Sequence, residues 1–307
     1  MESEGKTGVA FALCAFLFWG LVTPLYFKWA SAIPPLEILA HRIVWSLALV
    51  GILLYFWRRY AGLRRSLGQR RTLLVLLAAA IFVSLNWITY IWAISSGQAV
   101  EAALGYYINP LVNVVLGFVV LRERLNRAQM VAVAIAATGV INLTLQLGSV
   151  PWLALTLACT FGIYGLIRKT APLASMEGLF METVLLTPFA LGYIFFLEIG
   201  GQGTVGETGW SGLFLLILSG PVTALPLIWY ASGARRLRFS TIGLFQYLAP
   251  TCIVLVAVFL FGEPFTTAHL ITFACIWTAL AIYSFDSLRA SRTRRAAAIA
   301  AAANQAG

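Results

Sequence analysis

Long apolar segments separated by short polar connections run through almost the whole chain. Each segment is close to 20 residues long, the length that an α-helix needs to cross the hydrocarbon core of a bilayer. The segments lie at about residues 8–27, 36–57, 72–93, 99–120, 128–146, 150–168, 177–197, 211–231, 240–261 and 267–286. This pattern predicts an all-α integral membrane protein with ten transmembrane helices.

One apolar segment, at 101–125, carries polar residues and a proline near its centre, and its pattern returns at 240–265. The second copy sets Tyr247 against Tyr107, Pro250 against Pro110 and Glu263 against Glu123. Weaker matches follow in the same order at similar spacing. Because each half has five helices, an odd number, the halves must cross the membrane in opposite directions. We therefore predict an inverted-topology repeat, the architecture of many secondary transporters.

The predicted boundaries are 8–146 for the first five-helix repeat and 150–286 for the second. A tail at 287–307 follows, which we expect on the cytoplasmic side as a frayed helix or a disordered segment without an assigned function.

Composition excludes a soluble domain. Hydrophobic residues make up 61% of the chain, charged residues only 10%, and the mean hydropathy is +0.88, whereas a soluble protein has about 25% charged residues. The net charge of +10 does not indicate nucleic acid, because the basic residues cluster in the connections on one side of the ten-helix arrangement, with only Lys28 and Arg42 elsewhere. This positive-inside pattern places both termini in the cytoplasm, and the first apolar segment is predicted to be a retained helix rather than a signal peptide.

The sequence gives little support to an enzyme. Asp286 is the only aspartate, so there is no aspartate pair or aspartate-rich magnesium site, and the two histidines lie far apart. There is no nucleotide-binding loop of the GxxxxGK[ST] type. The four cysteines fall within predicted helices and read as small apolar residues. We expect no metal and no cofactor.

Several motifs resemble one family. In order they are WGLVTPLYFK, EILAHRIVWS, NWITYIWAI, EAALGYYINPLVNVVLG, YGLIRK and STIGLFQYLAPT. They resemble the RarD subfamily of EamA-domain transporters, in the drug/metabolite transporter superfamily. The resemblance implies a bacterial inner-membrane protein with two EamA repeats that exports small metabolites or drugs; related members export amino acids, including aromatic ones. Arg122 departs from the pattern, because glycine is expected before the Glu-Arg pair.

Polar and aromatic residues at membrane depth give a candidate binding site. Amides next to aromatic rings suit an amphipathic solute with hydrogen-bonding groups and an apolar body. An alternative is that these residues only hydrogen-bond neighbouring helices. The candidates are Trp19, Asn86, Trp87, Tyr90, Tyr106, Asn109, Tyr164, Gln246 and Tyr247, with the solute expected at Asn109 and Gln246.

Ionisable residues within the segments form a second candidate group for proton coupling or gating. Glu37 and His41 lie one helical turn apart, Arg42 is adjacent, and Glu182 is the repeat counterpart of Arg42. The alternative for the first three is a structural ion-pair cluster. Glu263 and Glu123 read as structural residues that join the halves.

We therefore predict a secondary transporter that works without ATP by alternating access. The alternative is a channel-like facilitator or a membrane sensor without a transport cycle. The expected partners are a small-molecule substrate, the lipid bilayer and protons as a candidate coupling ion, with no nucleic acid. The oligomeric state stays open, a monomer being compatible with the sequence.

Overall fold

The computed structural model describes residues 2–57, 69–122, 126–170, 175–204, 209–234, 236 and 245–306. Regular structure in these ranges is helical throughout. Eight of the helices are long and apolar enough to cross a membrane, and two further apolar helices, Trp152–Arg168 and Leu248–Leu260, are shorter. Together they account for all ten predicted segments, which confirms the predicted all-α membrane fold.

The first half begins with an interrupted helix made of α1 (Glu2–Leu17), the π-helical turn η1 (Phe18–Val22), α2 (Thr23–Trp29) and the short 3₁₀ turn η2 (Ala30–Ala32). It continues with α3 (Pro35–Phe56), α5 (Arg70–Ser95), α6 (Ala99–Leu121) and α7 (Arg127–Leu147). The second half contains α8 (Trp152–Thr170), α9 (Ser175–Ile199), α11 (Trp210–Ala234), α13 (Leu248–Leu255) with the π-helical turn η3 (Val256–Leu260), and α14 (Thr267–Ala306).

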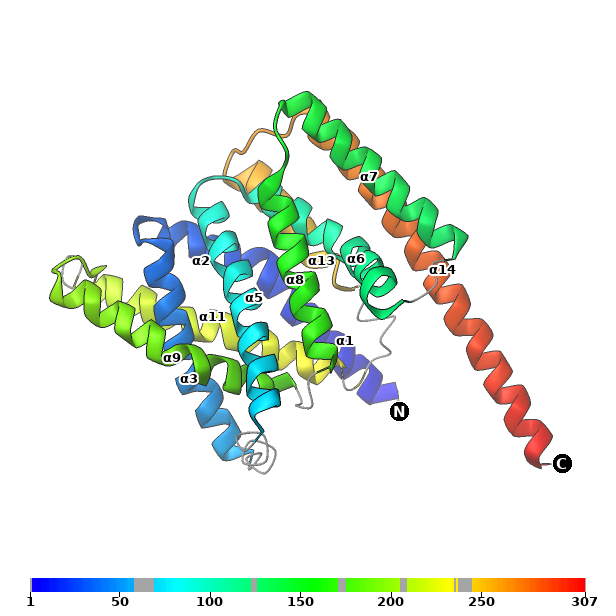
Figure 1. Ribbon diagram of the computed structural model, residues 1–307, viewed down its shortest axis with the longest axis horizontal. Coiled ribbons are helices and arrows are strands. Elements are labelled where there is room, and N and C mark those ends of the chain that lie inside the picture. Colours follow the sequence, from blue (N-terminus) through cyan, green and yellow to red (C-terminus); the bar gives the residue numbers. More distant parts are fainter. Residues whose placement is uncertain are drawn as a thin grey trace.

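Helix packing follows the repeat (Figure 1). The packing of α6 on α8 has its counterpart in α13 on η1, α5 on α8 corresponds to α11 on α1, and α3 on α11 corresponds to α5 on α9. The remaining major contacts join equivalent helices: α3 with α9, α6 with α13 and α7 with α14. Exchanging the two halves therefore returns the same set of contacts, as an inverted repeat requires.

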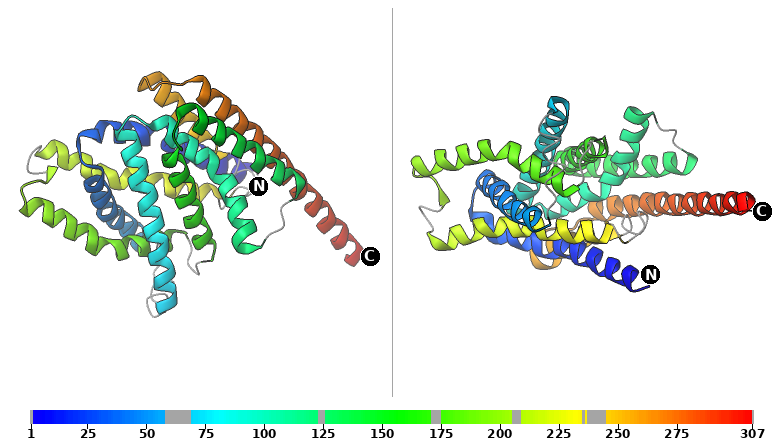
Figure 2. Two further views of the ribbon diagram at one scale, coloured as in Figure 1. Left: turned by 45° about the horizontal axis from the view of Figure 1, so that its top comes forward. Right: turned by 90° about the horizontal axis from the view of Figure 1, so that it is seen from below.

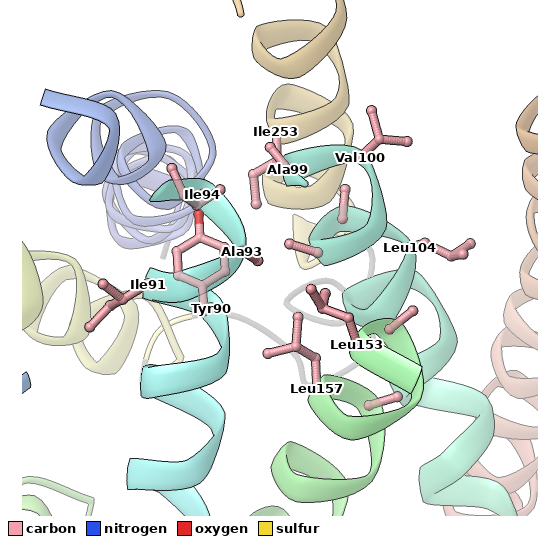
Figure 3. Close-up of a cluster of buried hydrophobic side chains, with 14 of the residues drawn as sticks. Tyr90, Ile91, Ala93, Ile94, Ala99, Val100, Leu104, Leu153, Leu157 and Ile253 are labelled. Carbon is pink, nitrogen blue, oxygen red and sulfur yellow. The ribbon is translucent and has the colours of Figure 1, made fainter. Parts of the chain in front are cut away.

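The centre of the bundle is packed where four helices from both halves meet. Figure 3 shows members of this cluster from four helices: Tyr90 and Ile94 of α5, Leu104 of α6, Leu157 of α8 and Ile253 of α13. Hydrophobic transfer gives little between helices already in lipid, so close packing is the main stabilising contribution here.

The interruption of the first helix has a local cause. Pro24 lacks a backbone donor, and its ring would clash with the carbonyl four residues earlier in a regular α-helix. The chain avoids the clash with a wider turn, in which the Thr23 N–H bonds to the Phe18 carbonyl five residues back. Gly20 in this turn lies directly against α13, since an added Cβ would be 2.5 Å from the Cβ of Cys252 and 2.8 Å from the Ala249 carbonyl.

Helices α7 and α14 form a pair at the edge of the bundle (Figures 1 and 2). Thr272 Oγ1 donates to the Gly139 carbonyl at 3.0 Å across their crossing. Beyond α7, α14 continues as one helix to Ala306. Of the two expected alternatives, a frayed helix or a disordered segment, the helical one agrees with the structure, because alanine has the highest intrinsic helix propensity.

Among the described residues, the ninth helix begins later than the sequence predicts. The ninth helix was expected from residue 240, but the described helix α13 begins at Leu248. Several residues used in the sequence argument lie outside the described residues, namely Glu123 and the basic residues at 58–65, 124, 235 and 238.

Candidate solute-binding site

A buried arginine lies against aromatic rings between α2, α3 and α5. The Arg42 guanidinium carbon lies 4.2 Å from the ring centroid of Trp87 and 5.7 Å from that of Phe27. Arg42 is seven residues into α3, which places it about 10 Å below the beginning of that helix. Its repeat counterpart Glu182 is seven residues into α9. Arg42 and Glu182 therefore lie equally far from the beginnings of their helices, which an inverted repeat places at opposite ends of the bundle.

A continuous row of aromatic rings extends from this arginine across the first half. Ring centroids are 4.9 Å apart from Tyr26 to Phe27, 5.8 Å from Phe27 to Tyr90, and 5.6 Å from Tyr90 to Tyr106. The row then passes to α8, with 6.2 Å from Tyr106 to Phe161 and 6.0 Å from Phe161 to Tyr164. All of these pairs are edge-to-face except the tilted Phe161–Tyr164 pair, and at these separations they form a rigid apolar surface with hydroxyl groups along it.

The row of aromatic rings ends at the ion pair between Arg168 and Glu182. Tyr164 donates its hydroxyl to Glu182 Oε2 at 3.3 Å, and Arg168 Nη1 lies 3.4 Å from Glu182 Oε1. Glu182 is 1% exposed, so its charge is kept inside the protein by these partners. The predicted candidates Tyr164 and Glu182 are therefore brought together.

Two predicted amides are engaged by helix α8. Asn86 Nδ2 donates to the Leu157 carbonyl at 3.0 Å and to Thr160 Oγ1 at 3.1 Å, while its Oδ1 accepts from Tyr106 at 3.3 Å. Asn109 Nδ2 donates to the Ala158 carbonyl at 3.0 Å, and its Oδ1 accepts from Asn113 at 3.2 Å. Both amides thus fix α5 and α6 to the opposite half of the protein.

Two carboxylates link the halves where α3 and α6 begin. Glu37 accepts from the backbone N–H of Thr204 at 2.9 Å and from its hydroxyl at 2.7 Å. Glu263 accepts from the N–H groups of Ala99 and Val100, at 2.8 and 2.9 Å, where α6 has free backbone donors. The structural expectation for Glu263 is confirmed. Within the described residues Glu37 forms no salt bridge with His41 or Arg42, and its hydrogen bonds go to Thr204 instead.

The remaining candidates lie apart from the Arg42 aromatic row. Trp19 packs against Phe16 and Tyr230, with centroids 5.6 and 5.9 Å away. Tyr247 stacks on Tyr107 at 6.4 Å. Gln246 is half-buried in the turn that precedes α13 and, among the described residues, makes no hydrogen bond to Asn109.

Sequence reasoning missed two contributors to this arrangement. Arg168 is one of the basic residues that form the positive-inside pattern, and it also pairs with Glu182 across the connection between α8 and α9. The short helical hairpin was a usable signal, because residues on both sides of such a turn face each other. Phe161 gave no signal, since an apolar residue in a membrane helix is unremarkable.

Comparison with known proteins decides the family. The model of the EamA-like transporter family matches residues 6–145. An uncharacterized transporter of Pseudomonas aeruginosa is 47% identical, over 94% of this chain and 96% of its own. Protein RarD of Streptomyces exfoliatus is 42% identical (98% and 95% covered), and Protein RarD of Escherichia coli is 39% identical (94% and 97%). The chain belongs to the RarD subfamily of EamA transporters.

A solved crystal structure supports the fold of this RarD-type chain. It superimposes with a TM-score of 0.53 at 24% identity, over 92% of this chain and 98% of the other. The family and the names of its members indicate a multi-pass membrane transporter rather than an enzyme. Among the described residues, no group of three or more His, Cys, Asp or Glu side chains is placed to hold a metal ion.

Proposed function

We propose that this RarD-type protein is a secondary transporter that exports small amphipathic solutes, such as amino acids or drugs, across the bacterial inner membrane without ATP. Its basic connections favour cytoplasmic termini. In this orientation α3 and α6 begin at the outer side. We propose alternating access, with a monomer sufficient for transport.

One observation carries this proposal. The two halves pack with equivalent helix contacts, and hydrogen bonds link the halves at one end of the bundle. Alternating access requires two states in which the halves exchange roles. Here the outer side is held together by Glu37 with Thr204 and by Glu263 with Ala99 and Val100. Release of these links is the proposed step that opens the outer side.

The solute is proposed to bind along the aromatic row near Arg42, with Trp87, Tyr90 and Tyr106 as lining residues. Asn86 supports Tyr106 through its Oδ1. The Asn109 amide already bonds to α8, so its proposed role is to hold the wall of the site. We keep Trp19 of the first half, and Tyr164, Gln246 and Tyr247 of the second half, as further proposed lining residues.

Glu182 is the proposed coupling residue if protons drive export. Glu37 is held by two hydrogen bonds from Thr204, which favours a fixed structural role. Glu182 instead pairs with a side chain, Arg168, that can rearrange when α8 and α9 move. His41 and Arg42 remain proposed participants beside the solute.

Flux measurements test the proposed function. Purified protein in liposomes is assayed for uptake and efflux of a panel of amino acids and amphipathic drugs, with and without a pH gradient. We expect saturable flux of at least one solute and a strong loss in Trp87→Ala, whereas Trp29→Ala, at an exposed aromatic residue, retains wild-type flux. Absence of flux for every solute under both conditions contradicts the proposal.

A further inference from the structure

The side chain of Arg42 is charged, buried and without an acid partner. Only 8% of the residue is exposed, although a guanidinium stays protonated in proteins. An arginine that reached toward the membrane surface would expose its charged end. Arg42 does not, so its charge faces the interior of the bundle.

Two buried carboxylates, Glu37 and Glu182, are engaged with other partners. Glu37, on the same helix, accepts from Thr204, and Glu182 pairs with Arg168 and Tyr164. Within the described residues, Arg42 makes no salt bridge, and its Nε has no hydrogen-bond partner. Contacts with the Trp87 and Phe27 rings offset only part of the cost of burying a cation.

A second unsatisfied donor belongs to the same cluster. The Tyr90 hydroxyl is buried and has no hydrogen-bond partner in the described part of the chain. Tyr90 touches Phe27 and Tyr106, and the phenols of Tyr26, Tyr90 and Tyr106 lie within electrostatic range of Arg42. Buried donors left without acceptors are costly, so two of them in one cluster indicate a missing acceptor.

The stacking of Arg42 leaves its donors available. Trp87 covers the face of the guanidinium at 4.2 Å, and the N–H groups point outward in the plane of the group. That edge matches the two oxygens of a carboxylate in a forked pair. The aromatic row beside it supplies apolar surface for the rest of such a molecule.

We propose that Arg42, assisted by the Tyr90 hydroxyl, binds the carboxylate of an anionic solute with an apolar body. This inference rests on the proposed transport function. No acid in the cluster is left to balance an ammonium group, since Glu37 and Glu182 are occupied. An organic anion therefore fits better than a zwitterion or a neutral compound.

The test is equilibrium binding to the detergent-purified full chain, measured by calorimetry. The three probes share the same phenyl-substituted three-carbon skeleton: 3-phenylpropionate, 3-phenylpropionamide and phenylalanine. We expect the carboxylate to bind at least tenfold more tightly than the other two. Arg42→Gln should remove this preference. Equal binding of carboxylate and amide, tighter binding of phenylalanine, or no binding of the carboxylate overturns the proposal.

Matched variants keep the test independent of folding. Tyr90→Phe keeps the ring and should weaken only the carboxylate, several-fold, while Arg127→Gln, at an exposed arginine, should change nothing. The carboxylate-to-amide ratio is internal to each variant, so partial loss of folded protein does not alter it. Saturable flux of other solutes without carboxylate preference would contradict this inference alone; absence of all flux would contradict the transport function instead.

Discussion

Arg122 and Gly262 occupy equivalent positions in the two halves and share a left-handed backbone conformation, with φ of 55° and 69°. Each follows a helix of the central pair, α6 in the first half and α13 with η3 in the second. Glycine adopts this conformation without strain, whereas a residue with a Cβ does not. Arg122 is the only residue other than glycine with positive φ in the described ranges.

Arg122→Gly should therefore stabilise the protein by about 1 kcal/mol, the strain relieved being larger than the added freedom of the unfolded chain. Thermal unfolding in detergent, followed by tryptophan fluorescence, measures the change. The matched variant Gly262→Ala should lower the midpoint. A destabilising effect of Arg122→Gly contradicts this explanation.

Removal of the Glu263 carboxylate should destabilise the end of the bundle where α6 begins. Glu263→Ala leaves the buried N–H groups of Ala99 and Val100 without an acceptor, which we expect to cost about 2 kcal/mol. Glu263→Gln keeps one acceptor and should cost less. The exposed Glu198→Gln serves as control in the same thermal unfolding assay. If Glu263→Ala unfolds like the control, the link between the halves has no energetic importance.

Close helix crossings should not tolerate a methyl group. In Gly105→Ala the new Cβ would lie 2.7 Å from the Ala154 carbonyl of α8, so the two backbones must separate, at an expected cost of about 2 kcal/mol. Gly165→Ala meets no atom within 4 Å and should be neutral or stabilising, because alanine favours the helix. Equal unfolding midpoints for both variants would contradict the packing argument.

The helices and their order could be predicted because the apolar segments, the basic connections and the repeated motifs can all be recognised in the sequence itself. The partners of individual side chains could not. Glu37 lies one turn from His41 in sequence, yet its hydrogen bonds go to Thr204 in the other half. The close approach of Gly20, in the π-helical turn Phe18–Val22, to α13 is likewise a tertiary contact.

Part of the candidate site could be predicted from the sequence, and part could not. Residue type singled out Trp87, Tyr90 and Tyr106; Tyr90 and Tyr106 meet because aromatic rings spaced along facing helices come together when those helices pack, whereas Trp87 lies on Arg42. The unpaired state of Arg42 could not be foreseen, because it depends on where Glu37 and Glu182 find other partners.

Glu182→Gln should abolish the response of flux to a pH gradient if the carboxyl carries the coupling proton, since an amide neither gains nor loses a proton near neutral pH. The comparison is made in liposomes with the pH gradient imposed in each direction. Glu37→Gln is the matched control and should keep the response. A full response in Glu182→Gln would remove this residue from coupling.

Counterflow tests the central claim, alternating access, most directly. Liposomes are loaded with an excess of the unlabelled solute that gives the largest flux, and uptake of the same labelled solute is followed over time. Alternating access predicts a transient accumulation of label above its external concentration, because each outward passage of unlabelled solute returns the binding site for an inward passage of labelled solute. Uptake that does not saturate and is unaffected by the internal solute would contradict it and favour a channel-like facilitator.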